Sequence, residues 1–205
     1  MSAERIKVVG AGLIGTSLGL ALSKQGIDVG LENRSKANLR LAIEYGAGSE
    51  AAGDYDLVVV CVSPEMTAEV VAAQLEAHPN ALVTDVASVK AQISRDVAML
   101  SPDSAGRYVG SHPMAGREKG GPGAARADLF FARPWVITPT PGSAKESVDR
   151  LKSLANQLGA LPVVMSPEEH DEAVALVSHL PQLVSSALAA RLQGAKDQQL
   201  NLSGQ

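Results

Sequence analysis

Short apolar runs alternate with amphipathic stretches along most of the chain. The runs include residues 6–9, 28–31, 57–62 and 81–86, and the third is rich in β-branched residues with no polar alternation. Such a continuous run is typical of a parallel strand that is covered on both faces. Because stretches with helical spacing separate the runs, the pattern predicts an α/β fold with a doubly wound, mostly parallel sheet.

Later runs continue this alternation. Residues 107–110, 135–139 and 161–165 are predicted strands, and a helix is expected over 145–158, closed by Gly159. Between them, the glycine-rich stretch 116–123 is predicted to be a mobile loop. We therefore place a first domain over residues 1–165.

The pattern changes at Ser166. Ser166, Pro167 and Glu169 have the order expected for an N-cap, a first helical position and a capping box. The helix that follows is expected to be buried widely, since apolar residues cover most of its circumference: Val174, Val177, Leu180, Leu183, Val184 and Leu188. A segment of about 40 residues rarely folds alone. Residues 166–205 are therefore predicted to begin an all-helical domain, completed either by a homodimer or by further chain.

The first apolar run leads into a glycine motif. It reads Gly10-Ala11-Gly12-Leu13-Ile14-Gly15, and helical spacing follows it. Gly10 suits a tight turn, Gly12 a close approach of phosphates to the backbone, and Gly15 close packing of helix on strand. With Leu13 and Ile14 at the helix N-terminus, this motif predicts a Rossmann-type dinucleotide-binding domain.

The choice of cofactor depends on the end of the second strand. There the sequence reads Glu32-Asn33-Arg34. An acid about 20 residues beyond the glycines binds the adenosine ribose of NAD, whereas a nearby arginine suits the 2′-phosphate of NADP. If Asn33 holds the key position beside Arg34, NADP is favoured; if Glu32 points inward, NAD is favoured. We prefer NADP, although a solvated surface Arg34 is an equal alternative.

Polar residues follow three of the predicted strands. Ser63, Ser88 and His112 would lie along one carboxyl edge, which is where open α/β sheets bind ligands. A neutral imidazole at His112 could accept the proton of a substrate hydroxyl as hydride leaves for nicotinamide. A satisfied structural histidine is the alternative, and Ser63 is assigned to the cofactor.

The other histidines occupy different positions. His78 precedes a proline at the opposite edge of the sheet and is interpreted as an inert surface residue. His170 is in the first turn of the capped helix, where a solvent-facing or structural role is expected. His179 precedes Leu180-Pro181, and the proline is expected to kink the helix beside it.

Composition excludes several classes of function. The 205 residues carry a net charge of −4, which gives no basic surface for nucleic acid or anionic lipid. The one cysteine, Cys61, forms no intrachain disulfide, so we expect a cytoplasmic protein with a buried thiol. The first strand begins close to Met1, which leaves no room for a signal peptide, and no apolar run is long enough to cross a membrane. The histidines lack metal-ligand spacing, and no nucleophile stands out.

Four motifs in this order resemble the prephenate dehydrogenase family. They are the glycine motif continued by Thr16-Ser17, then residues 84–90 (TDVASVK), 110–116 (GSHPMAG) and 177–182 (VSHLPQ). The resemblance covers essentially the whole chain. It implies NAD(P)-dependent oxidative decarboxylation of prephenate to 4-hydroxyphenylpyruvate in tyrosine biosynthesis, or of arogenate to tyrosine in some members.

The resemblance also implies roles for individual residues. His112 would deprotonate the ring hydroxyl, Ser88 would orient hydroxyl and imidazole, and His179 would help to bind substrate. The family's helical domain normally contributes an arginine to a substrate carboxylate, and no matching segment is present in this sequence. Arg117, Lys119 or Arg133 could substitute, with exposed loop cations as the alternative.

Two other classes remain as alternatives. A β-hydroxyacid dehydrogenase would need a lysine on the long helix after the cofactor domain, where this sequence has His179. A cofactor-binding regulatory or fragment domain would keep the glycine turn but lack turnover.

Overall fold

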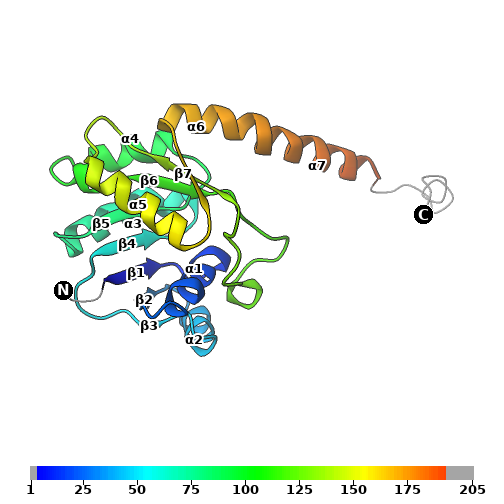
Figure 1. The fold of residues 1–205 in the computed structure, drawn as a ribbon. Coiled ribbons are helices and arrows are strands. Elements are labelled where there is room, and N and C mark those ends of the chain that lie inside the picture. Colours follow the sequence, from blue (N-terminus) through cyan, green and yellow to red (C-terminus); the bar gives the residue numbers. More distant parts are fainter. Residues whose placement is uncertain (1–3, 193–205) are drawn as a thin grey trace. The chain divides into compact units, whose positions relative to one another are not determined.

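The computed structural model describes residues 4–192. The chain divides into two compact units, Met1–His170 and Asp171–Gln205, and each is described here by itself. The first unit contains two sheets, and the second continues a helix that begins at the end of the first (Figure 1).

A parallel sheet of five strands forms the centre of the first unit. In the order of their pairing the strands are β3 (Ser49–Glu50), β2 (Asp28–Glu32), β1 (Arg5–Val9), β4 (Leu57–Val60) and β5 (Leu82–Asp85). β1 is central, and it pairs with β2 in the register Val9 to Glu32 and with β4 in the register Val9 to Val60. The glycine motif therefore follows the central strand, β1, whose neighbours in the sheet are β2 and β4.

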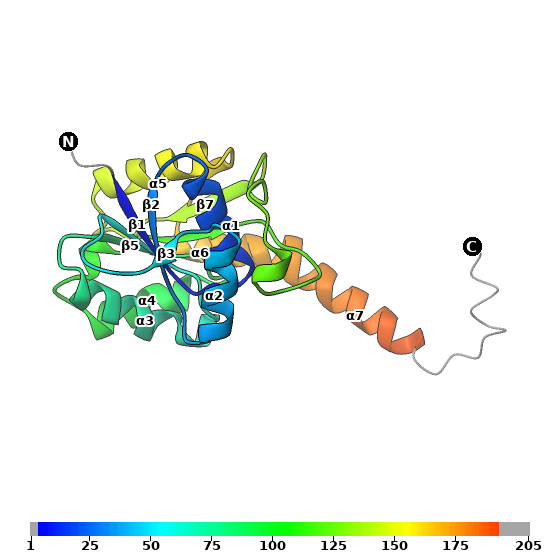
Figure 2. The same cartoon turned by 90° about the horizontal axis from the view of Figure 1, so that it is seen from below.

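Helices cover both faces of this sheet, as Figure 2 shows for α3 and α4 on one side and α5 on the other. Their bounds are α1 (Leu13–Ser23), α2 (Lys36–Glu44), α3 (Pro64–Ala77), α4 (Ala91–Leu100) and α5 (Lys145–Gln157). Side chains alternate between the faces: Ile6 and Val8 join the core beneath α1, α2 and α5, and Val58 and Val60 join the core beneath α3 and α4. The predicted doubly wound α/β arrangement of the Rossmann type is confirmed.

A second sheet follows, with strand order β6 (Gly110–Pro113), β7 (Pro134–Thr138) and β8 (Leu161–Val164). β6 is antiparallel to β7, and β7 is parallel to β8. The strand predicted over 107–110 begins only at Gly110, because Ala105–Arg107 form a 3-10 turn. The chain first runs beside β5, where Val109 N donates to the Val83 carbonyl at 3.1 Å.

The glycine-rich loop after β6 has some structure of its own. It contains the 3-10 turn η2 (Pro122–Ala124), which packs against α1 and α2. The mobility predicted for residues 116–123 stays a prediction.

The second helical segment begins with the predicted capping box. Ser166 N donates to Glu169 Oε2 at 2.8 Å, and Glu169 N donates to Ser166 Oγ at 3.2 Å. α6 (Pro167–Val174) leads through a π-helical turn, Ala175–His179, into α7 (Leu180–Leu192). A π-helical turn thus precedes Pro181, and the kink expected at that proline stays a prediction.

The expected wide burial of this helix is not found within the single chain. Val174 is buried, but these apolar side chains are exposed: Leu176, Val177, Leu183, Val184 and Leu188. By length and composition the helical stretch Pro167–Ala190 could cross a membrane, contrary to the expectation from sequence. Helices that pack against other helices share this composition, so it is weak evidence for a membrane.

Candidate functional site

The turn between β1 and α1 has no space for side chains at two of its glycines. Gly10 has φ +111°, and a Cβ there would lie 2.2 Å from the Cys61 carbonyl oxygen. A Cβ at Gly15 would lie 1.9 Å from the Gly10 carbonyl oxygen. These two residues therefore hold strand, turn and helix in close contact, as the motif predicts.

Gly12 differs because no protein atom lies within 4 Å of the position that its Cβ would occupy. It is the N-cap of α1 and provides no side-chain cap, and the first turn contains no acidic residue. The first N–H groups of a helix have no intrahelical acceptor, and the helix dipole attracts anions there. The turn therefore fits the pyrophosphate of a dinucleotide.

A cavity of about 330 Å³, called here the site cavity, joins this turn to the polar strand ends. Ser88 and His112 line it together with Gly12, Leu13 and Ile14. Its wall also contains Cys61, Val62, Pro64, Val86, Ala87, Pro113, Ala115, Gly120 and Gly121. Ser63 is exposed and lies between two wall residues without lining the cavity itself.

The end of β2 has a different arrangement from the one preferred on sequence grounds. Asn33 Oδ1 accepts from Ala11 N at 2.9 Å, and Asn33 Nδ2 donates to the Ser35 carbonyl at 2.9 Å. The Asn33 amide thus holds the glycine turn. Arg34 is exposed, and the half-exposed Glu32 carboxylate forms an ion pair of 2.7 Å with Lys7.

His112 has a histidine partner that sequence reasoning did not find. His112 Nδ1 lies 2.9 Å from His170 Nε2, and the rings meet edge to face. His170 is fully buried, so the solvent-facing alternative for this residue is wrong. A hydrogen bond at Nδ1 fixes the orientation of the ring.

A buried ion pair lies beneath Ser88 and His112. Lys90 Nζ pairs with Asp85 Oδ2, both side chains are fully buried, and Lys90 also donates to the Ser111 carbonyl at 3.0 Å. Asp85 accepts from Ala87 N at 2.9 Å and from Tyr108 OH at 2.7 Å. Burial, with the Asp85 charge beside it, raises the pKa of Tyr108 well above its ordinary value, so the phenol stays a neutral donor. The pair ties the loop after β5 to β6.

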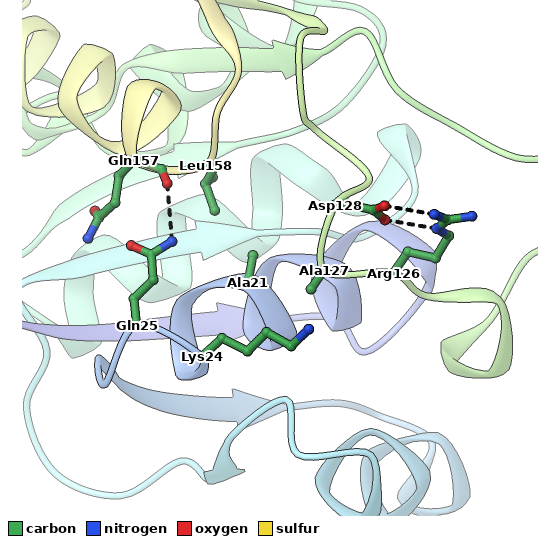
Figure 3. A pocket seen from close by; sticks show the side chains of 8 residues that line it. All are labelled: Ala21, Lys24, Gln25, Arg126, Ala127, Asp128, Gln157 and Leu158. Carbon is green, nitrogen blue, oxygen red and sulfur yellow. Dashed lines mark hydrogen bonds and ion pairs between the residues drawn. The ribbon is translucent and has the colours of Figure 1, made fainter.

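Other cavities lie outside this arrangement. One of about 540 Å³ is lined by Lys24 and Gln25, beyond the C-terminal end of α1, and by Gln157, whose carbonyl accepts from Gln25 at 3.1 Å (Figure 3). It lies at the wrong end of α1 for an anion.

A further cavity, of about 470 Å³, is lined by Arg117, Arg126 and Arg133 and shares Ala115 with the site cavity. Arg126 is held by Asp128 at 2.7 Å (Figure 3). Of the cations considered as substitutes for the family's arginine, Arg117 and Arg133 line this neighbouring cavity, and Lys119 is not among its lining residues.

Other predictions from the sequence concern the remaining histidines and a metal site. His78 is buried, so its interpretation as a surface residue is wrong. The side chain of His179 lies outside the described residues. Among residues 4–192 there is no group of three potential metal ligands. The sequence does signal the buried ion pairs, because charged residues stand in or next to apolar runs. They are Lys7 in the first strand, and Asp85 and Lys90 around the end of β5.

Together, the strand, open glycine turn and helix define a dinucleotide-binding domain of the Rossmann class. The model of the prephenate dehydrogenase nucleotide-binding domain matches residues 18–165, and that of the prephenate dehydrogenase dimerization domain matches residues 166–205. The chain belongs to the prephenate dehydrogenase family.

Relatives and solved structures agree with this membership. NovF of Streptomyces niveus, named as a probable prephenate dehydrogenase, is 42% identical over 199 residues, which are 96% of this chain and 55% of that protein. The prephenate dehydrogenase of Bacillus subtilis is 34% identical, over 90% of this chain and 53% of its own length. The chain thus spans about half the length of these relatives.

Two solved structures have the same fold. A complex of the A. aeolicus prephenate dehydrogenase with hydroxyphenyl propionate and NAD+ has a TM-score of 0.86 at 25% identity, covering 97% of this chain and 72% of that one. Synechocystis arogenate dehydrogenase has a TM-score of 0.81 at 32% identity, covering 96% and 72%.

Proposed function

We propose that this chain contains the cofactor site and the proton-accepting residue of a prephenate dehydrogenase. The reaction is the oxidative decarboxylation of prephenate to 4-hydroxyphenylpyruvate in tyrosine biosynthesis. One observation carries the proposal: Ser88 and His112 line the same cavity as the phosphate-binding turn at Gly12. Arogenate is the alternative substrate, and the Synechocystis arogenate dehydrogenase is the neighbour that favours it.

In this proposal the protein's own groups handle the proton. His112, held through Nδ1 by His170, accepts the proton of the ring hydroxyl at Nε2. Ser88 orients that hydroxyl toward the imidazole, and His179 contributes to substrate binding, a role taken from the family resemblance. A bound nicotinamide supplies the hydride acceptor. Loss of carbon dioxide from the ring then yields an aromatic product, so no metal is required.

We infer that the site binds NAD in place of NADP, the cofactor preferred on sequence grounds. That preference assumed Asn33 at the ribose position, but the Asn33 amide holds the glycine turn through Ala11 N. Glu32 ends β2 with a half-exposed carboxylate, in the position of the acid that binds an adenosine ribose. We therefore infer that NAD binds through Gly12, Leu13, Ile14 and Glu32, and that Arg34 is available to the 2′-phosphate of NADP.

The test is to combine the protein with prephenate or arogenate and with NAD+ or NADP+, and to follow the absorbance of reduced nicotinamide. Chromatography then identifies 4-hydroxyphenylpyruvate or tyrosine. Turnover with prephenate is the expected result. Turnover with arogenate alone would identify arogenate as the substrate in place of prephenate. Cofactor binding without turnover would favour the fragment-domain alternative.

We further propose a homodimer through the segment after His170. Its exposed residues, such as Leu183 and Leu188, need a cover, and the model that matches residues 166–205 describes a dimerization domain. Sedimentation should give a dimer that Leu183→Glu dissociates, and a monomer at all concentrations would contradict the proposal. The cytoplasmic location expected from sequence stays a prediction.

A further inference from the structure

Lys7 is a charged residue in the middle of the central strand. Its side chain is 8% exposed, and Lys7 lies in β1 between Ile6 and Val8, which face the opposite core. A buried ammonium is costly unless it is paired. Lys7 Nζ forms an ion pair of 2.7 Å with Glu32 Oε2 and lies 3.2 Å from His78 Nε2.

His78 does not neutralise Lys7. Burial and the neighbouring ammonium lower the pKa of His78, while Asp54 and Glu32 act in the opposite direction. A neutral His78 accepts from Lys7 through Nε2 and adds no charge. The compensating charge for Lys7 is therefore the Glu32 carboxylate.

The pair has two consequences at the cofactor site. It holds the half-exposed Glu32 carboxylate at the end of β2, which is where an acid binds the adenosine ribose in NAD-binding domains. It also places the Lys7 ammonium next to the Glu32 carboxylate, which is the group that would repel the 2′-phosphate of NADP. Coulomb interaction falls only with the inverse of distance, so an ammonium 2.7 Å from the carboxylate offsets much of its repulsion of an anion beyond it.

We propose that Lys7 is a specificity-determining residue, whose buried ammonium offsets the charge of Glu32 and thereby sets how strongly the site discriminates between NAD and NADP. The inference rests on the proposed cofactor site and deepens it. Lys7 touches neither cofactor and acts through its charge beside Glu32. With Lys7 in place the acid tolerates a 2′-phosphate, and without it the acid rejects one.

The experiment measures the dissociation constants of NAD+ and NADP+ by calorimetry, with no substrate present. Lys7→Met removes the charge and keeps the length of the side chain. The Kd for NADP+ should rise about tenfold more than the Kd for NAD+. Lys24→Met, which removes an exposed lysine beyond the far end of α1, is the matched control and should leave both constants unchanged.

A second background separates charge from folding. Removing one partner of a buried pair can destabilise the protein, so the change is repeated in Glu32→Gln. There Lys7→Met should still raise the Kd of NADP+ more than the Kd of NAD+, because the charges of Lys7 and Glu32 act additively on a 2′-phosphate.

An equal loss for both cofactors, with the ratio of the two dissociation constants unchanged in both backgrounds, would overturn the role of Lys7. Failure of the unmodified protein to bind either cofactor would instead overturn the proposed function, and the Lys7 proposal with it.

Discussion

The histidine pair at the site cavity fixes the orientation of the His112 ring. His170 lies 2.9 Å from Nδ1 and is fully buried, so its own ring is held by packing. A ring held in this way loses little entropy when the substrate hydroxyl arrives. We interpret His170 as a positioning residue that acts through His112.

A change at His170 should therefore affect catalysis and leave cofactor binding intact. In His170→Leu, kcat should fall about 10- to 100-fold, while the Kd of NAD+ stays within about twofold. His170→Gln keeps a hydrogen-bonding group and should recover part of the loss. Steady-state kinetics with a melting curve for each variant is the check, and a normally folded Leu variant with full kcat would remove His170 from the mechanism.

Some residues of the site could be predicted from the sequence and others could not, for a physical reason. His112 lies within β6 of the second sheet, and it lines the same cavity as Ser88. Ser88 could be predicted because it follows β5, and the ends of parallel strands meet at one edge. The partners His170 and Lys7 could not, because side-chain pairing across distant elements depends on packing that spacing along the chain does not encode. The bond from Ala11 N to Asn33 could not be predicted for the same reason, since it joins the end of β2 to the glycine turn.

At the scale of elements, the turn between β1 and α1 contains two glycines that the fold requires, Gly10 and Gly15, and one that is open to a ligand, Gly12. Gly12→Ala should fold normally, since nothing lies within 4 Å of the added methyl group. That methyl group would occupy the space of the pyrophosphate, so the Kd of NAD+ should rise at least about tenfold.

The matched control is Gly142→Ala, which also has open space around it and lies outside the lining of the site cavity. Calorimetry gives the Kd of NAD+ for both variants, and thermal melting shows whether both are folded. Undiminished NAD+ binding by Gly12→Ala would place the pyrophosphate elsewhere.

Elements with strong local signals were predictable, and those set by tertiary context were not. The capping box at Ser166 and Glu169 forms as expected because both partners lie within one helical turn. The start of β6 was placed three residues too early, because Arg107 turns away to donate to carbonyls near the end of α3.

At the scale of the whole molecule, the buried charges make stability dependent on pH. The pKa of His78 lies below its ordinary value of 6.5 through burial and the Lys7 ammonium. The unfolded chain therefore takes up a proton near pH 6.5 more readily than the folded one. This contribution to stability is fully present above pH 6.5 and is lost as the pH falls through the lowered pKa.

The melting temperature should accordingly decrease below pH 6.5, and His78→Gln should flatten that decrease. The charged groups around His78 are Lys7, Glu32 and Asp54, and Arg107 donates to its carbonyl at 2.9 Å. Melting curves across this range test the prediction, and an unchanged slope in the variant would assign the acid sensitivity to another group.

The family match covers both parts of the chain, while the proposed proton transfer depends on His112, His170 and Ser88 of the first unit. The most direct test of that chemistry is the turnover of His112→Asn with its cofactor affinity measured in the same protein. We predict a turnover reduced by roughly 10²–10⁴-fold and a Kd for NAD+ within about twofold of the unmodified protein. Unchanged turnover would contradict the account, because another group would then accept the proton.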